Sequence, residues 1–117
     1  MKNLKDKVIS ITGGATGIGF ALAKSFGAEG AKIVIGETRE KKLQEAIDLL
    51  VSLDIDADKT YLDVTNLKSV ENFANFTCER YGCVDMLINN AGISGARGRI
   101  DKVDIEEAKK VFDVNFF

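Results

Sequence analysis

Three glycines, Gly13, Gly17 and Gly19, lie between a short apolar run and a segment with helical character, in the stretch Ile-Thr-Gly-Gly-Ala-Thr-Gly-Ile-Gly that begins at Ile11. Glycines so placed allow a positive φ at a strand end, a close approach of a ligand to the backbone, and close packing of the next helix on the sheet. A diphosphate there would meet unpaired N–H groups and the positive end of a helix dipole. The stretch therefore predicts a strand-turn-helix unit that binds a nucleotide.

Short apolar runs alternate with longer segments of helical period along the whole chain. The expected strands are Val8–Thr12, Ile33–Gly36, Thr60–Leu62 and Met86–Asn89, and the expected helices are Ile18–Glu29, Lys41–Leu53, Leu67–Tyr81 and Ile105–Phe116. Continuously apolar strands are typical of a parallel sheet that helices cover on both faces. Right-handed crossovers then predict an α/β fold, a Rossmann-like doubly wound parallel sheet of about four strands in the order 3-2-1-4.

Length and charge limit what the chain can be. Its 117 residues are enough for one hydrophobic core and too few for two ordinary domains, so residues 1–117 are expected to form a single domain. A formal net charge of −2 argues against nucleic acid as a partner. No apolar run approaches the roughly 20 residues of a membrane span, and Met1–Lys7 does not resemble a signal peptide. We therefore expect no membrane association and a cytoplasmic location.

The two cysteines do not form a metal-binding or redox motif. Cys78 and Cys83 are five positions apart, unlike Cys-x-x-Cys, and the sequence has no histidine that could complete a metal site. We expect no metal, and we interpret both cysteines as reduced thiols that pack as small, partly buried residues.

An acidic residue follows the second expected strand. Glu37 lies eighteen positions after Gly19, close to the roughly 20-residue spacing at which a carboxylate accepts hydrogen bonds from the adenosine ribose. This favours NAD over NADP, because a 2′-phosphate would be repelled and Thr16 and Thr38 offer no cation. Arg39, a nearby cation, would instead favour NADP. Alternatively, Glu37 is an ordinary solvated residue at a strand end.

Polar residues also follow the third and fourth strands. Asp63 could accept a hydrogen bond from the adenine amino group, with Val64 against the ring, although Asp63 could equally cap the next helix. Asn89 and Asn90 place amides where the sheet ends, and we expect Asn89 to tie strands together. The small residues Ala91 and Gly92 would leave room for a cofactor.

These residues resemble the short-chain dehydrogenase/reductase family, whose N-terminal half has this order of elements and a Thr-Gly-x-x-x-Gly-x-Gly fingerprint. Thr12 through Gly19 matches the fingerprint in full, and further matches follow in the family's order at Glu37, Asp63-Val64, Asn89-Asn90-Ala91-Gly92 and Val114-Asn115. The resemblance implies an NAD cofactor, with NADP less favoured, bound by Gly13, Thr16, Gly17, Ile18, Gly19, Glu37, Asp63, Val64, Asn90, Ala91 and Gly92.

The resemblance also implies a catalytic role for Asn115, because in relatives this asparagine holds a water in a proton relay. Considered alone, Asn115 is a polar residue in an expected helix. Relatives transfer the proton with a tyrosine, a lysine four residues later, and a serine. Tyr61 and Tyr81 lack a lysine at that spacing, and Ser94 is not identified as the catalytic serine.

The chain is thus expected to be the N-terminal, cofactor-binding part of a longer NAD-dependent oxidoreductase that transfers hydride between an alcohol and a ketone. By itself the chain is expected to be inactive. The resemblance also implies a homo-oligomer as one possible assembly, because relatives are commonly dimers or tetramers. Without a further strand, Met86–Asn89 would form an exposed apolar edge that lowers stability.

The sequence leaves two other interpretations open. A non-catalytic dinucleotide-binding sensor or interaction module would keep the fold and lack the Tyr-x-x-x-Lys, and an open reading frame encoding that motif beyond codon 117 would refute it. A different doubly wound protein, such as a methyltransferase or a flavodoxin-like receiver, rests on fold analogy alone. Glu37 and the segment Asn89–Gly92 argue against it.

Overall fold

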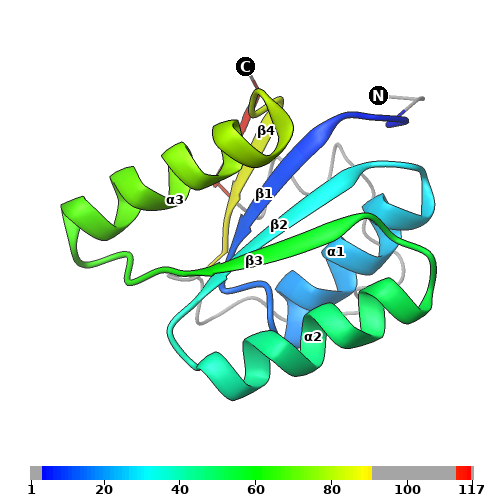
Figure 1. Cartoon of the computed structure of the whole chain (residues 1–117), viewed down its shortest axis with the longest axis horizontal. Helices are drawn as coiled ribbons and strands as arrows, with labels where there is room; N and C mark the ends of the chain where they lie inside the picture. Colours follow the sequence, from blue (N-terminus) through cyan, green and yellow to red (C-terminus); the bar gives the residue numbers. More distant parts are fainter. Residues whose placement is uncertain (1–3, 91–112, 117) are drawn as a thin grey trace.

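The computed structural model describes residues 4–90 and 113–116, in which strands and helices alternate as expected (Figure 1). The strands are β1 (Val8–Thr12), β2 (Lys32–Glu37), β3 (Ala57–Tyr61), β4 (Met86–Asn89) and β5 (Asp113–Phe116). The helices are α1 (Gly17–Ala28), α2 (Glu40–Ser52) and α3 (Leu67–Tyr81).

The first four strands confirm the doubly wound parallel topology. Within the five-stranded sheet they are adjacent in the order β3-β2-β1-β4, and every pairing among them is parallel. Helices α1 and α2 lie on one face of the sheet and α3 lies on the other (Figure 1). The carboxyl ends of these parallel strands therefore meet at one edge, which is where ligands bind in open α/β sheets.

The third strand begins earlier than predicted. Strand β3 runs from Ala57 to Tyr61, whereas Thr60–Leu62 was expected. Its residues Ala-Asp-Lys-Thr-Tyr are half-buried or exposed, because β3 lies at the edge of the sheet and pairs with β2 alone. An edge strand needs no continuous apolar run, so its polar first half gave no strand signal.

Two expectations about the carboxyl-terminal end were wrong. The expected helix Ile105–Phe116 is a strand over its last four residues, β5, which pairs antiparallel with β4, while residues 105–112 lie outside the described part. Consequently β4 is not the unpaired apolar edge that we expected. Asp-Val-Asn-Phe alternates polar and apolar residues, which suits a strand, and pairing satisfies the backbone groups of β4.

The core lies on both faces of β1 and β2. All five residues of β1 are buried, as are the last five of β2. On the α1 and α2 face, a large apolar cluster joins the strands to both helices through residues such as Ile11, Ile35, Leu22 and Leu50. On the α3 face, Val34 packs in a smaller cluster with Leu62 and Phe73. The two clusters fix the strand ends that carry the polar residues singled out above.

The cysteines differ in part from expectation. Cys78 and Cys83 are free thiols, as predicted, but both are exposed rather than partly buried. Within the described residues, no helix is long and apolar enough to cross a membrane.

A buried hydroxyl pair links β1 to α3. Ser10 Oγ donates to Thr77 Oγ1 over 3.3 Å, and Thr77 Oγ1 donates to the Phe73 carbonyl over 2.9 Å. We expect Thr77→Val to lower the free energy of unfolding by about 1–3 kcal/mol, because it leaves the buried Ser10 hydroxyl without its acceptor. Urea denaturation measures this change. Adding Ser10→Ala removes the stranded hydroxyl and should recover part of the loss, whereas strictly additive losses would contradict the prediction.

Candidate functional site

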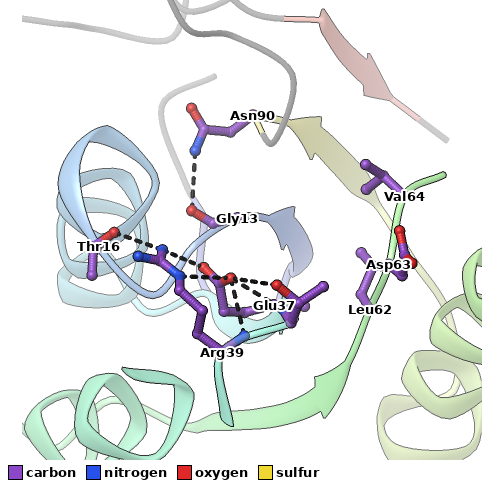
Figure 2. A pocket seen from close by; sticks show the side chains of 10 residues that line it. Gly13, Thr16, Glu37, Arg39, Leu62, Asp63, Val64 and Asn90 are labelled. Carbon is purple, nitrogen blue, oxygen red and sulfur yellow. Dashed lines mark hydrogen bonds and ion pairs between the residues drawn. The ribbon is translucent and has the colours of Figure 1, made fainter. Parts of the chain in front are cut away.

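A cavity of about 370 Å³ lies at the carboxyl ends of the four parallel strands (Figure 2). Residues from the turn after β1, from the end of β2 and the loop after it, from the loop after β3 and from the residue after β4 surround it. They are Gly13, Thr16, Gly36, Glu37, Thr38, Arg39, Leu62, Asp63, Val64 and Asn90. The topology thus joins segments that are far apart in the sequence.

The glycine-rich turn needs its glycines for two physical reasons. Gly13 and Gly17 have φ angles of 66° and 61°, in the left-handed region that side chains disfavour. Gly19 instead permits close approach, since a Cβ there would lie 2.5 Å from the Gly13 carbonyl oxygen and 2.8 Å from Gly14 Cα. The positive φ expected for Gly13 at the end of the strand is confirmed.

The turn leads into the amino end of α1, beside the cavity. Thr16 is the N-cap, and its side chain makes no capping hydrogen bond to the helix. The first turn of α1 carries no acidic residue. The N–H groups of Gly17, Ile18 and Gly19 precede the first intrahelical donor, Phe20, and belong to the set that a helix leaves without an internal partner. This arrangement suits an anion such as a diphosphate.

Glu37 ends β2 as a buried carboxylate, only 7% exposed. Its Oε2 accepts hydrogen bonds from the backbone N–H groups of Thr38, at 3.0 Å, and of Arg39, at 3.3 Å. A buried charge needs such partners. The structure therefore contradicts the alternative that Glu37 is an ordinary solvated residue, because its carboxylate is held at the cavity wall.

Arg39 adds an ion pair that the sequence analysis did not anticipate. Its Nη2 lies 2.9 Å from Glu37 Oε1 and its Nε lies 3.2 Å from Oε2, so the guanidinium donates hydrogen bonds to both carboxylate oxygens. Nη2 also donates to Thr16 Oγ1 over 3.1 Å. Arg39 thereby spans from the end of β2 to the start of α1 (Figure 2).

The ion pair keeps Glu37 charged. Hydrogen bonding from the Arg39 side chain lowers the pKa of Glu37 below its ordinary value of 4.5, against the opposing effect of burial. A carboxylate with a lowered folded-state pKa stabilises the fold above its unfolded pKa, and the stabilisation is lost as the pH falls through the lowered value. At neutral pH the carboxylate is thus an acceptor only.

Asp63 and Val64 lie across the cavity from Thr16 and Arg39 (Figure 2). Asp63 Oδ1 accepts from the Thr65 backbone N–H at 3.0 Å and from its hydroxyl at 2.6 Å, and these bonds lower the pKa of Asp63. The cap of α3 is Asn66, whose side chain accepts from Ser69 N. Asp63 therefore shapes the loop before the helix while still lining the cavity.

The two asparagines after β4 have different partners. Asn89 Oδ1 accepts from Thr12 Oγ1 over 3.0 Å, which confirms its expected role of tying strands together. Asn90 Nδ2 donates to the Gly13 carbonyl over 3.1 Å, and Asn90 N donates to Thr12 Oγ1 over 2.9 Å. Asn90 thus joins β4 to the glycine-rich turn and lines the cavity as well.

Of the predicted site residues, Gly13, Thr16, Glu37, Asp63, Val64 and Asn90 line the cavity, and Gly17, Ile18 and Gly19 form the first turn of α1 beside it. Ala91 and Gly92 lie outside the described residues. The backbone of Asn115 lies in β5, opposite Leu87.

The cavity is also lined by four residues that were not predicted as site residues, Gly36, Thr38, Arg39 and Leu62. Leu62 closes the wall beside Asp63, and Gly36 has no room for a side chain, since a Cβ would lie 2.6 Å from Leu62 Cδ2. Gly36 and Leu62 are the last residues of two expected strands, and this position was the sequence signal that could have identified them as site residues.

Comparisons with known proteins identify the family of this chain. Residues 7–117 match the family model described as short chain dehydrogenase. Zerumbone synthase from Zingiber zerumbet is 40% identical over 113 residues, which cover 96% of this chain and 42% of that protein. The chain therefore belongs to the short-chain dehydrogenase family of oxidoreductases, and it spans about two-fifths of the length of this relative.

Solved structures show the same fold with either dinucleotide. An actinorhodin polyketide ketoreductase with NADPH has a TM-score of 0.74 at 31% identity, covering 95% of this chain and 42% of that one. A short-chain dehydrogenase/reductase from Burkholderia phymatum in complex with NAD has a TM-score of 0.72 at 30% identity, covering 74% of this chain and 31% of that one. The fold is thus the dinucleotide-binding Rossmann type.

Proposed function

We propose that this chain binds NAD(H) and forms the cofactor-binding part of an oxidoreductase that transfers hydride between an alcohol and a ketone. The observation that carries the proposal is the carboxylate of Glu37, held in the cavity beside the amino end of α1. A ribose diol pairs with such an acceptor, and the adjoining diphosphate pairs with the helix terminus.

In this function, each wall of the cavity binds one part of the dinucleotide. The N–H groups of Gly17, Ile18 and Gly19 hold the diphosphate, and Glu37 accepts from the ribose. Asp63 and Val64 receive the adenine. Asn90 positions the turn through Gly13, and with Ala91 and Gly92 it serves the nicotinamide side. The bound dinucleotide supplies the hydride chemistry, while the protein binds and orients it.

Proton transfer requires a tyrosine followed by a lysine four residues later. The 117 residues contain no such Tyr-x-x-x-Lys set. We propose that Asn115 serves the proton relay of the completed enzyme, and that the chain alone binds dinucleotide without turning over substrate. A small alcohol or ketone is the proposed substrate class.

Glu37→Ala is expected to weaken NADH binding by roughly tenfold to a hundredfold. The reason is that a hydrogen bond to a charged group contributes about 1.5–3 kcal/mol, and each 1.4 kcal/mol is a factor of ten in affinity. Isothermal titration calorimetry of the purified chain with NADH measures the change.

Glu40→Ala is the matched control, because Glu40 is an exposed acid in the first turn of α2, outside the cavity lining. It should leave NADH affinity within about twofold of the unaltered chain, since exposed charges outside a site contribute little. An unaltered chain that gives no saturable heat at millimolar NADH would overturn the proposed function, as would equal losses for both variants.

A further inference from the structure

Helix α3 ends in a left-handed turn that has a cysteine on each side. Gly82 follows the last helical residue with a φ of 89°, and its N–H donates to the Cys78 carbonyl over 2.7 Å. At helix ends of this kind, the residue after the left-handed position commonly contacts the residue whose carbonyl accepts that bond. These two residues are Cys83 and Cys78. The turn therefore brings together two thiols whose spacing in the sequence is not that of a redox motif.

Both thiols are open to reagents in solution, and neither is needed for packing. Cys78 and Cys83 are free and exposed. The Sγ of Cys83 donates to Asp85 Oδ2 over 3.7 Å, and the same oxygen accepts from Val8 N over 2.8 Å. A thiol is a weak donor, so loss of its proton leaves Asp85 held by the stronger bond to β1. Oxidation of the two thiols thus removes no buried contact.

Electrostatics also indicate that the two sulfur atoms are close. Partial desolvation, followed by the negative charge of Asp85, raises the pKa of the Cys83 thiol, and a charge on Cys78 raises it further. Two thiolates at this turn repel each other, because like charges at short range disfavour ionisation. A bond between the two sulfur atoms removes both charges.

We propose that Cys78 and Cys83 form a reversible intramolecular disulfide when the folded chain meets a small-molecule disulfide such as oxidised glutathione. The end of α3 is thus a thiol-oxidation site, separate from the cavity at the carboxyl ends of the strands. The bond links the last turn of α3 to the segment that leads into β4. In a reducing compartment such a disulfide is transient and responds to the redox state.

The reaction is a pair of thiol–disulfide exchanges. One cysteine thiolate attacks a sulfur atom of oxidised glutathione, which breaks the glutathione disulfide and releases one glutathione thiolate. The second cysteine thiolate attacks the protein sulfur atom of this mixed disulfide and releases the other glutathione. The two protein thiols are together oxidised by two electrons, the glutathione disulfide is reduced by two, and the two protons pass through solvent to the glutathione thiolates.

Mass spectrometry of the chain after incubation with oxidised glutathione, followed by alkylation of free thiols, tests the inference. The unaltered chain should lose two hydrogen atoms, carry no glutathionyl group and resist alkylation. Trypsin cleaves after Arg80, between the two cysteines, so peptides 69–80 and 81–97 should stay joined until a reductant is added. The oxidised chain should elute from gel filtration as the reduced chain does, because the bond lies within one molecule.

Cys78→Ser and Cys83→Ser are matched variants that each keep one of the two thiols. Each should stop at the mixed disulfide with glutathione, because the second nucleophile is missing. Concentrated urea removes the turn but keeps both thiols. The folded chain should give a ratio of intramolecular to mixed disulfide at least about tenfold above that in urea, since the fold sets the effective concentration of one thiol at the other.

No dinucleotide takes part in these measurements, so their outcome is independent of the proposed function. A joined pair of peptides in an unchanged elution position, absent from both serine variants, supports the inference. It would be overturned by a folded chain that stays unreacted, that carries glutathione on both cysteines, or that forms covalent dimers. A ratio of products that is the same in urea would also overturn it, because the turn would then contribute nothing.

Discussion

Gly19→Ala is expected to weaken NADH binding at least about a hundredfold, because a diphosphate loses two or more charge-assisted hydrogen bonds worth about 1.5–3 kcal/mol each. The added Cβ would lie 2.5 Å from the Gly13 carbonyl oxygen and 2.7 Å from Asn90 Nδ2. The oxygen belongs to the backbone, so the turn itself must move away from α1. That shift displaces the N–H groups proposed to hold the diphosphate.

Gly27→Ala, on the same helix, is the matched control. A Cβ at Gly27 would lie 2.5 Å from Ile55 Cγ2 and 2.9 Å from Ile55 Cδ1, which are side-chain atoms at the far side of the fold from the turn. Overpacking of this kind costs about 1–3 kcal/mol of stability. Both variants should therefore unfold at lower urea concentration, but only Gly19→Ala should lose NADH binding under conditions where it is folded. Unchanged NADH affinity in Gly19→Ala would contradict the account of the turn.

Ile35→Ala is expected to lower the free energy of unfolding by about 2–5 kcal/mol, the range for truncating a fully buried aliphatic side chain. Ile35 has no exposed surface, and its Cγ2 would lie 2.9 Å from a Cβ at Gly14, so it packs directly against the glycine-rich turn. Small domains are stable by only about 5–15 kcal/mol, so this loss is a large fraction of the total. Urea denaturation followed by fluorescence of the tyrosines, or by circular dichroism, gives the value.

Leu49→Ala removes the same number of carbon atoms from an exposed position. Leu49 lies on α2 with 55% of its surface exposed, and substitutions at such positions usually change stability by about 0.5 kcal/mol or less. If Ile35→Ala cost no more than Leu49→Ala, the assignment of the core on this face of the sheet would be wrong.

The central part of the fold could be predicted because its signals are strong and local. Strands β1 and β2 are almost entirely buried and β4 is partly buried, so their residues are mostly apolar and stand out from the amphipathic segments that follow. The glycine-rich turn shows directly where the first strand ends. Strand order then follows from right-handed crossovers rather than from any single residue.

The edges of the sheet were harder to predict. Strand β3 pairs on one side only, which lets it carry Asp58 and Lys59, so the apolar signal began too late in the chain. Strand β5 was mistaken for part of a helix because its short alternation follows a segment with helical period. The direction and partner of such a strand depend on β4, which lies far away in the sequence.

The candidate site, like the fold, could be predicted only in part. Glu37, Asp63 and Asn90 could be found because each lies at or shortly after the end of a parallel strand, at the edge where ligands of this fold bind. The ion pair from Arg39 could not be found in this way, because it depends on the path of the backbone after β2 and on the side-chain rotamer. Sequence alone shows the two opposite charges near each other but not that both carboxylate oxygens are engaged.

The central claim is that backbone N–H groups of the glycine-rich turn, with Glu37, hold a dinucleotide. Titration of the nitrogen-15-labelled chain with NADH, followed by heteronuclear NMR, tests it most directly. We expect saturable shifts at the amides of Gly17, Ile18 and Gly19 and of Thr38, which donates to Glu37, with little change at Gly82 beyond the end of α3. Shifts that are absent at millimolar NADH, or that are confined to residues outside the turn and the end of β2, would contradict the claim.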